Sequence, residues 1–274
     1  MKQIFFFTIN FLFLFTSSSS AQRGWELGGW AGVSHYFGDL NTSLDLKHPN
    51  FAGGGVFRFN FNDRICAKLG ANYGSIGAND NTSTNPFELR RNAHFKSIII
   101  DGSAQVEFNF MSYDYFDKSK WFTPYLFGGI GVYHFNPQAK YKGVTYDLRP
   151  LGTEGQFAGE EYYTTQPALV YGGGVKMALN EVWSINVELS MRKLFTDYLD
   201  DVSKTYPNMN DLRKAHGEVA VALSDPSLTT ENQLKVGQLG RQRGDAHTTD
   251  TFTFFGVSLL YYFGDLRCPP ISNR

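Results

Sequence analysis

The chain has 274 residues and a formal net charge of −1 at pH 7, and this balance argues against a nucleic-acid partner. Glycine (28 residues) and aromatic residues (25 Phe, 15 Tyr and 4 Trp) are frequent, yet the mean hydropathy is negative at −0.29. A transmembrane barrel needs this combination, because its wall carries aromatic girdles while alternate positions are polar. Two cysteines, Cys66 and Cys268, are too few for a disulfide scaffold.

The N-terminus has the three parts of a secretory signal peptide. Lys2 supplies the positive charge, residues 4–15 form an apolar stretch too short to span a bilayer, and residues 19–21 (Ser-Ser-Ala) form a small-residue cleavage site. No cysteine follows that site, so we expect no lipoprotein anchor. The predicted organisation is a signal peptide at 1–21, an exported outer-membrane barrel at 22–267 and a periplasmic tail at 268–274.

Eight segments alternate apolar and polar residues with the period of two that a β-strand shows. The last of them carries Gly256, Leu259, Tyr261 and Phe263 in the pattern of a strand that closes an outer-membrane barrel. The fifth segment is apolar on both faces, which leaves its orientation open. The eight predicted strands are 25–37, 51–61, 65–75, 95–110, 121–135, 168–179, 183–195 and 252–263.

The connections between these strands alternate in length. Two tight turns (62–63 and 180–181) and one modest link (111–120) fall on one end of the barrel, and four long connections fall on the other. Bacterial barrels have short periplasmic turns and long external loops. We therefore predict an all-β fold, an eight-stranded antiparallel transmembrane β-barrel, with a short helix near 210–223. The predicted long loops are 38–50, 76–94, 136–167 and 196–251.

Charged residues occupy inward positions of the predicted strands. An eight-stranded barrel is just wide enough inside for side chains to fill it, and buried charges are tolerated when they are paired and hydrogen-bonded. We therefore predict a lumen packed with salt bridges rather than an open pore. The predicted network consists of Arg58, Lys68, Asp101, Glu107, Lys176, Glu188 and Arg192.

Five stretches resemble the PorG family of outer-membrane barrels, which is associated with the type IX secretion system of Bacteroidetes-type bacteria. The resemblance implies a non-enzymatic accessory barrel, surrounded by outer-membrane lipid, that binds the periplasmic ring formed by the PorK lipoprotein and PorN. We expect no catalytic residue, cofactor, metal ion or small-molecule substrate. The stretches are YFGDL at 36–40, FNPQAKY at 135–141, YDLRPLGTEGQ at 146–156, RKLFTDYLDDVS at 192–203 and QRGD at 242–245.

Loop residues in these stretches are candidate contact residues. The acidic run at 197–201 could hold a calcium ion, but it lacks the regular spacing of a full ligand loop, and a solvated or hydrogen-bonded loop is the stronger interpretation. The tripeptide at 243–245 (Arg-Gly-Asp) is interpreted as a turn packed on other loops rather than as an adhesion motif. The candidate contact residues are Asp147, Arg149, Asp197, Tyr198, Asp200 and Asp201.

Three alternatives stay open. Cys66 faces inward near the periplasmic end and Cys268 follows the last strand on the same side, so they could form a disulfide if their Cα atoms lie within about 7 Å; two free thiols are the default. A lipid-modifying enzyme would need a His base beside a Ser nucleophile, and none of the six histidines lies in a His-x-Ser arrangement. A surface adhesin would use the long stretch 197–250.

Overall fold

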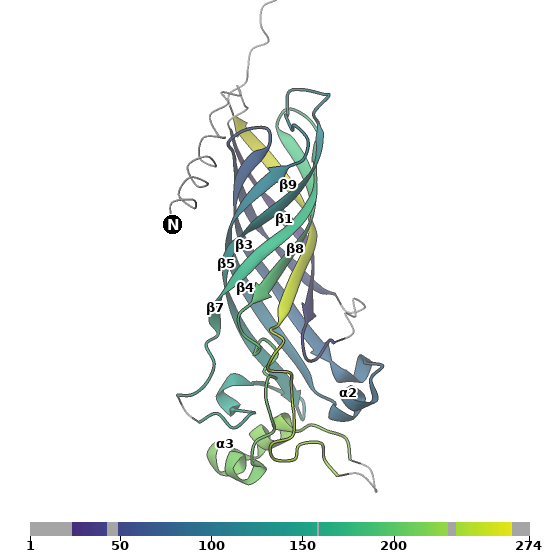
Figure 1. Cartoon of the computed structure of the whole chain (residues 1–274), viewed down its shortest axis with the longest axis vertical. Helices are drawn as coiled ribbons and strands as arrows, with labels where there is room; N and C mark the ends of the chain where they lie inside the picture. The colour runs from purple at the N-terminus through teal and green to yellow at the C-terminus, as the bar shows by residue number, and fades with distance from the viewer. Residues whose placement is uncertain (1–23, 43–48, 158, 230–233, 265–274) are drawn as a thin grey trace, which may run out of the picture.

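The structure, a computed structural model, describes residues 24–42, 49–157, 159–229 and 234–264. The predicted signal peptide and tail lie outside these residues. The described chain forms a long antiparallel barrel with loops and short helices gathered at one end (Figure 1). The elements are β1 (Gly24–Phe37), β2 (Asn50–Asn60), β3 (Ile65–Asn79), η1 (Asp80–Thr82), α2 (Pro86–Arg91), β4 (His94–Asn109), β5 (Phe122–Tyr141), β6 (Val144–Asp147), η2 (Arg149–Leu151), β7 (Thr165–Ala178), β8 (Trp183–Leu194), α3 (Met209–Ser224) and β9 (Thr251–Gly264).

The sheet closes into a barrel of eight wall strands. The strands pair in the order β4-β3-β2-β1-β9-β8-β7-β5, and β4 also pairs with β5. Each of these pairs is antiparallel, and β1 pairs with β9 from Gly24 opposite Gly264 to Phe37 opposite Thr251. Closure gives every wall strand two neighbours, which satisfies its backbone N–H and C=O groups in hydrocarbon. The predicted eight-stranded antiparallel barrel is confirmed.

Alternation of side chains gives the wall an apolar outside and a polar inside. On β4, Ile98, Ile100 and Val106 are exposed, whereas Asp101 and Glu107 are buried. Every wall strand carries at least one exposed large apolar residue, and a belt of this kind indicates contact with lipid. One member from each strand, between 39% and 67% exposed, is Leu27, Phe57, Leu69, Ile100, Ile130, Leu169, Leu189 and Val257. None of the helices in the described part of the chain is long and apolar enough to cross a membrane.

Strand β5 settles the orientation that the sequence left open. It exposes Leu126, Ile130 and Val132, and it buries Tyr125 and Tyr133. Both faces of this segment are apolar, so local pattern could not distinguish them. Pairing with β4 on one side and β7 on the other fixes which face meets the lumen.

Strand β5 also corrects one predicted loop. It continues to Tyr141 and forms a hairpin with β6, where the sequence predicted a long loop at 136–167. The turn between the two strands contains Lys142 and Gly143 with φ angles of 51° and 85°. A two-residue turn of type I′ requires positive φ at both central residues, and glycine adopts such an angle readily, so Gly143 was the available signal for this hairpin.

The two ends of the barrel are built differently. At the end with the short turns, Tyr113, Tyr115 and Tyr262 form a buried cluster, with the rings of Tyr115 and Tyr262 stacked at 4.7 Å. At the opposite end the long connections form a folded layer that contains α2 and α3 (Figure 1). We call this layer the cap; it comprises the described parts of residues 38–49, 80–93, 148–164 and 195–250.

One of the two cap helices was predicted. Helix α3 covers the segment expected near 210–223, with a break at Gly217, where φ is 84°. Helix α2 lies in the connection that the sequence predicted as irregular at 76–94. At the start of α2 the Asn85 side chain accepts a hydrogen bond from Phe87 N, and Pro86 is the first residue of the helix. This Asn-Pro pair is a helix start signal, but α2 is too short to show helical periodicity.

Candidate functional site: the lumen network and the cap

The seven predicted lumen residues all lie on the inward face of the barrel. They come from β2, β3, β4, β7 and β8. Six of them are buried, and the Glu188 side chain is 24% exposed. They divide into two hydrogen-bonded groups, one around Glu107 and one around Arg192.

Glu107 is the centre of the larger group. Its carboxylate oxygens lie 2.8 Å from Arg58 Nε, 3.0 Å from Lys68 Nζ and 2.6 Å from Lys176 Nζ. Lys68 Nζ also donates to Glu188 Oε2 at 2.5 Å. A carboxylate held by three buried cations is stabilised strongly by charge, and it anchors three other strands to β4.

Glu26 belongs to the same group, although the predicted network did not include it. Arg58 Nη1 donates to Glu26 Oε2 at 2.7 Å, and Asn60 Nδ2 donates to Glu26 Oε1 at 2.6 Å. Its position on the inward face of the first strand was the available signal. With Glu26, the group has three carboxylates and three cations, so its formal charge is zero.

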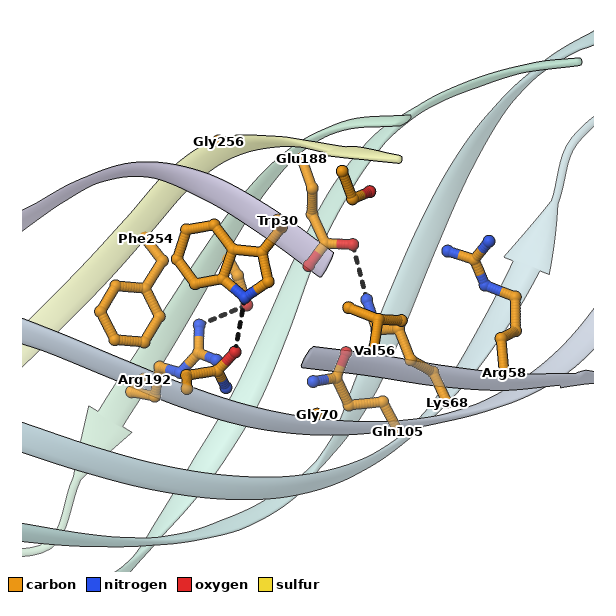
Figure 2. A pocket seen from close by; sticks show the side chains of 13 residues that line it. Trp30, Val56, Arg58, Lys68, Gly70, Gln105, Glu188, Arg192, Phe254 and Gly256 are labelled. Atoms are coloured by element: carbon orange, nitrogen blue, oxygen red, sulfur yellow. Dashed lines mark hydrogen bonds and ion pairs between the residues drawn. The ribbon is translucent and has the colours of Figure 1, made fainter. Parts of the chain in front are cut away.

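The second group surrounds Arg192. Its Nη2 atom donates to Asp101 Oδ1 at 3.0 Å, and Asn72 donates to the same carboxylate. Trp30 Nε1 donates to Asn72 Oδ1 at 2.8 Å. The guanidinium carbon also lies 4.4 Å from the centroid of the Phe254 ring, a favourable cation–π arrangement. Figure 2 shows Arg192, Trp30 and Phe254 together on one side of the pocket.

A small cavity lies between the two groups. Its volume is about 40 Å³, and it is lined by Arg58, Lys68, Gln105, Glu188 and Arg192, among others (Figure 2). A cavity of this size holds about three or four water molecules at most, because one water needs roughly 10–15 Å³ of such space. The polar lining provides the hydrogen-bond partners that a buried water requires. At this level the lumen is filled by side chains rather than open as a channel.

The Cys66 thiol is buried beside the larger group. Lys176 Nζ lies 3.7 Å from its sulfur atom. The other cysteine, Cys268, lies outside the described residues, so the two free thiols expected by default and the disulfide alternative both stay untested.

The acidic run at 197–201 is buried in the cap rather than solvated. Asp200 and Asp201 are 1% and 2% exposed. Thr153 and Tyr162 donate hydrogen bonds to Asp201, the latter at 2.8 Å. Burial raises the pKa of Asp201 to about 6 and that of Asp197 to about 8. Among the described residues, no group of three or more His, Cys, Asp or Glu side chains is placed to hold a metal ion.

Arg243 ties several cap segments together. Its Nη1 atom lies 3.1 Å from Glu154 Oε1 and also donates to the Asp201 carbonyl. Glu154 accepts a further hydrogen bond from Ser203 N at 2.8 Å. The segment that follows Arg243 is held in turn, because Asp245 N donates to the Asp39 carboxylate at 3.0 Å.

Of the six candidate contact residues, five lie in the packed part of the cap and Asp147 lies apart. Tyr198 stacks on Tyr162 with ring centroids 4.9 Å apart, and Arg149 Nε donates to the Tyr162 carbonyl at 2.7 Å. Asp147 is exposed on β6 and accepts hydrogen bonds from Asn136 and Gln138. The five candidate residues in the cap therefore mainly contact other residues of the cap.

Three histidines have described partners that are not serines. His94 Nε2 accepts from Lys140 N at 3.2 Å, and His216 Nε2 lies 3.1 Å from the Gln156 carbonyl. His134 Nδ1 lies 2.9 Å from Thr165 Oγ1, at an exposed position on the outer wall.

The chain matches one family and is similar to several solved barrels. The family model described as a domain of unknown function (DUF6089) matches residues 2–220. No curated protein matches the chain. The fold is similar to OprG of Pseudomonas aeruginosa (11% identity, 89% of this chain, 98% of that chain, TM-score 0.42), to Neisserial surface protein A (9%, 87%, 97%, 0.42) and to the N-terminal β-barrel domain of Pseudomonas aeruginosa OprF (11%, 89%, 100%, 0.37).

Proposed function

Because the chain belongs to the DUF6089 family, a domain family of unknown function, we propose a role from its architecture: an accessory outer-membrane barrel of the type IX secretion machinery. In this proposal it acts without chemistry of its own, resembles the PorG-type barrels, and binds the periplasmic ring formed by the PorK lipoprotein and PorN. The observation that carries the proposal is the meeting, in the cap, of four of the stretches in which the resemblance lies.

The wall supports the outer-membrane part of the proposal. Its outward face is apolar on all eight strands, and its loops are short at one end and long at the other. Bacterial outer-membrane barrels share both features, with the short turns in the periplasm. In the proposal the cap therefore lies outside the cell, and both ends of the described chain, Gly24 and Gly264, lie on the periplasmic side.

The cap supports the family resemblance. Asp39 binds Asp245 N, Glu154 binds Ser203 N, and Arg243 binds Glu154, so each contact joins two different stretches. Buried polar groups need matched partners, and changing one residue of such a set leaves another unsatisfied. Residues from stretches that are far apart in the sequence are therefore held together in one cap, and a rigid barrel can display such a surface.

The lumen supports a structural rather than a transporting role. Buried ion pairs cross it from β2 to β4 and from β7 to β4. The cavity between the charged groups is only about 40 Å³. A barrel filled in this way suits a rigid anchor in the membrane.

The ring contact in this proposal uses the end with the short turns. Two grooves of about 740 and 460 Å³ lie there, and Phe116 and Val182 border both. Lys118 and Glu181 are exposed beside them. These side chains are available to a periplasmic partner, whereas the cap faces the other side of the membrane.

Affinity purification from detergent-solubilised outer membranes tests the proposal. A deletion strain is complemented with the wild-type chain, with a Lys118→Glu/Glu181→Lys double variant, or with a matched Asp211→Lys/Lys214→Glu control on the exposed face of α3. Both double variants preserve net charge. We expect ring proteins to copurify with the wild type and the control, and to be lost from the Lys118/Glu181 variant.

Two outcomes would contradict the proposal. Recovery of the barrel without ring proteins, together with intact export of type IX cargo in the deletion strain, would remove the secretion role. A lipopolysaccharide acyl-chain profile that changes on deletion would instead favour the enzyme alternative.

A further inference from the structure

Two buried carboxyl groups of the cap are bridged by one tyrosine. Tyr36 Oη lies 2.6 Å from Asp200 Oδ2 and 3.2 Å from Asp250 Oδ1. All three side chains are at most 2% exposed. The remaining carboxyl oxygens accept backbone hydrogen bonds at 2.9 Å, from Val202 N to Asp200 and from Leu199 N to Asp250. The positions of both carboxyl groups are thus fixed.

One phenol O–H cannot supply the hydrogen atoms for both of these hydrogen bonds, so the geometry requires one additional proton. A phenol has a single O–H and donates to one acceptor at a time. If Tyr36 donates to Asp200, the Tyr36 oxygen can only accept a hydrogen bond from Asp250. Asp250 must then carry a proton and donate it. The same reasoning holds with the two aspartates exchanged, so the pair holds one proton between them.

In the described part of the chain, no cation neutralises the pair. Within the described residues, neither Asp200 nor Asp250 lies at ion-pair distance from a lysine or arginine. Burial and neighbouring carboxylates raise the pKa of both groups. The titratable and charged groups that face the Tyr36, Asp200 and Asp250 cluster are Asp39 after β1, Asp197 after β8, Arg91 at the end of α2, Tyr133 on β5 and Tyr162 before β7.

Arg91, the one cation in this set, is engaged elsewhere. Its Nε and Nη2 atoms donate to the Asp80 carboxylate at 2.8 and 2.9 Å. Close packing also restricts water, because a Cβ atom on Gly38 would collide with Asp250 and Tyr36. The two aspartates therefore rely on the shared proton and on backbone N–H groups.

We propose that Asp200, Tyr36 and Asp250 form a proton-dependent latch that holds the cap closed on the barrel. The three residues come from β1, from the segment after β8 and from the residue before β9. One proton therefore joins the first wall strand to both ends of the longest connection. Without it, two negative charges lie on either side of a single O–H in a buried site, and their repulsion favours separation.

The direction of the pH effect follows from proton linkage. The closed latch holds a proton that the open, hydrated segment releases near neutral pH, so the closed cap is favoured in acid and lost as the pH rises. The latch depends on the geometry of the cap and not on the secretion role. A failure of either proposal leaves the other standing.

The latch is tested on the full-length barrel in lipid nanodiscs. The first measurement is the infrared signal of protonated carboxyl groups at pH 7 in the wild type, in Asp250→Asn and in Asp197→Asn. The second is amide hydrogen exchange of residues 197–203 between pH 6 and pH 9.5, corrected for the intrinsic rate. Asp211→Asn, on the exposed face of α3, is the matched control.

We expect protonated-carboxyl signals at pH 7 from Asp197 and from the latch. Asp250→Asn should remove the latch signal alone, Asp197→Asn should retain it, and Asp211→Asn should retain both. Loss of one proton makes cap opening rise by up to about tenfold per pH unit. We expect this rise in the wild type and the control. Asp250→Asn should remove the part of the rise that the latch contributes, because its amide can donate to Tyr36 while its oxygen still accepts from Leu199 N.

The Asp197→Asn variant keeps the test decisive, because it removes the other carboxyl group that is mostly protonated at pH 7. Absence of a protonated-carboxyl signal in Asp197→Asn at pH 7 overturns the latch, even if Asp250→Asn fails to fold. So does a pH dependence of exchange in Asp250→Asn equal to that of the wild type.

Discussion

Replacing Glu107 by glutamine tests whether charge balance holds the lumen together. The variant keeps the size and shape of the side chain and removes one negative charge. Three buried cations, Arg58, Lys68 and Lys176, then share two carboxylates. The ion-paired residues of the described lumen are Glu26, Asp101, Glu107 and Glu188 on the acidic side and Arg58, Lys68, Lys176 and Arg192 on the basic side.

The expected cost is large for a single atom change. Removing one partner of a buried ion pair costs roughly 3–5 kcal/mol, because an uncompensated charge stays buried. Glu107 contacts three cations, so we expect Glu107→Gln to fall at the upper end of that range. Lys176 forms its described ion pair with Glu107 alone. The double variant Glu107→Gln/Lys176→Met restores charge balance and should regain about 2 kcal/mol.

Urea unfolding from lipid vesicles, followed by tryptophan fluorescence, measures these differences. Asp117→Asn is the control, because its pair with Lys120 at 3.5 Å is exposed on both sides, and such pairs contribute little to stability. The reasoning is refuted if Glu107→Gln unfolds within about 1 kcal/mol of the wild type. It is also refuted if the double variant is no more stable than the single one.

Three further predictions concern the cap and the lumen. Arg243→Met should loosen the cap by roughly 3 kcal/mol without unfolding the barrel, seen as faster tryptic cleavage within 197–250; unchanged cleavage would count against it. Burial raises the pKa of Asp39 and Asp201 to about 6 and that of Asp197 to about 8. The closed cap should therefore be most stable in acid and lose stability as pH rises through these values. When amide hydrogen exchange of the cap is measured against pH, Asp197→Asn should remove the part of this loss that occurs near pH 8. In planar bilayers the wild type should show no stable conductance, since its cavity is only about 40 Å³; a reproducible open state would contradict the filled lumen.

The wall of the barrel could be derived from the sequence because its information is local. A period of two assigns each residue to one face, and a slip of one residue would put Glu107 in lipid and Val106 in the lumen. The sequence could therefore predict that the charged side chains of Arg58, Glu107 and Lys176 face the lumen. Their partners were not, because contact between β4 and β7 side chains depends on closure and strand stagger, which no single segment encodes.

In the cap, the local sequence pattern does not predict which side chains are buried. The run at 197–201 has the composition of a solvated loop, yet Asp200 is 1% exposed. Its partner Asp250 lies far along the chain and reaches it because β8 and β9 are neighbours in the sheet, which brings both ends of their connection to the end of β1. Sequence alone determined a lipid-facing barrel with charges inside, since alternation is sufficient for that. Only the tertiary structure decided which charges meet and which carboxyl groups leave water, because burial depends on what the rest of the chain places over them.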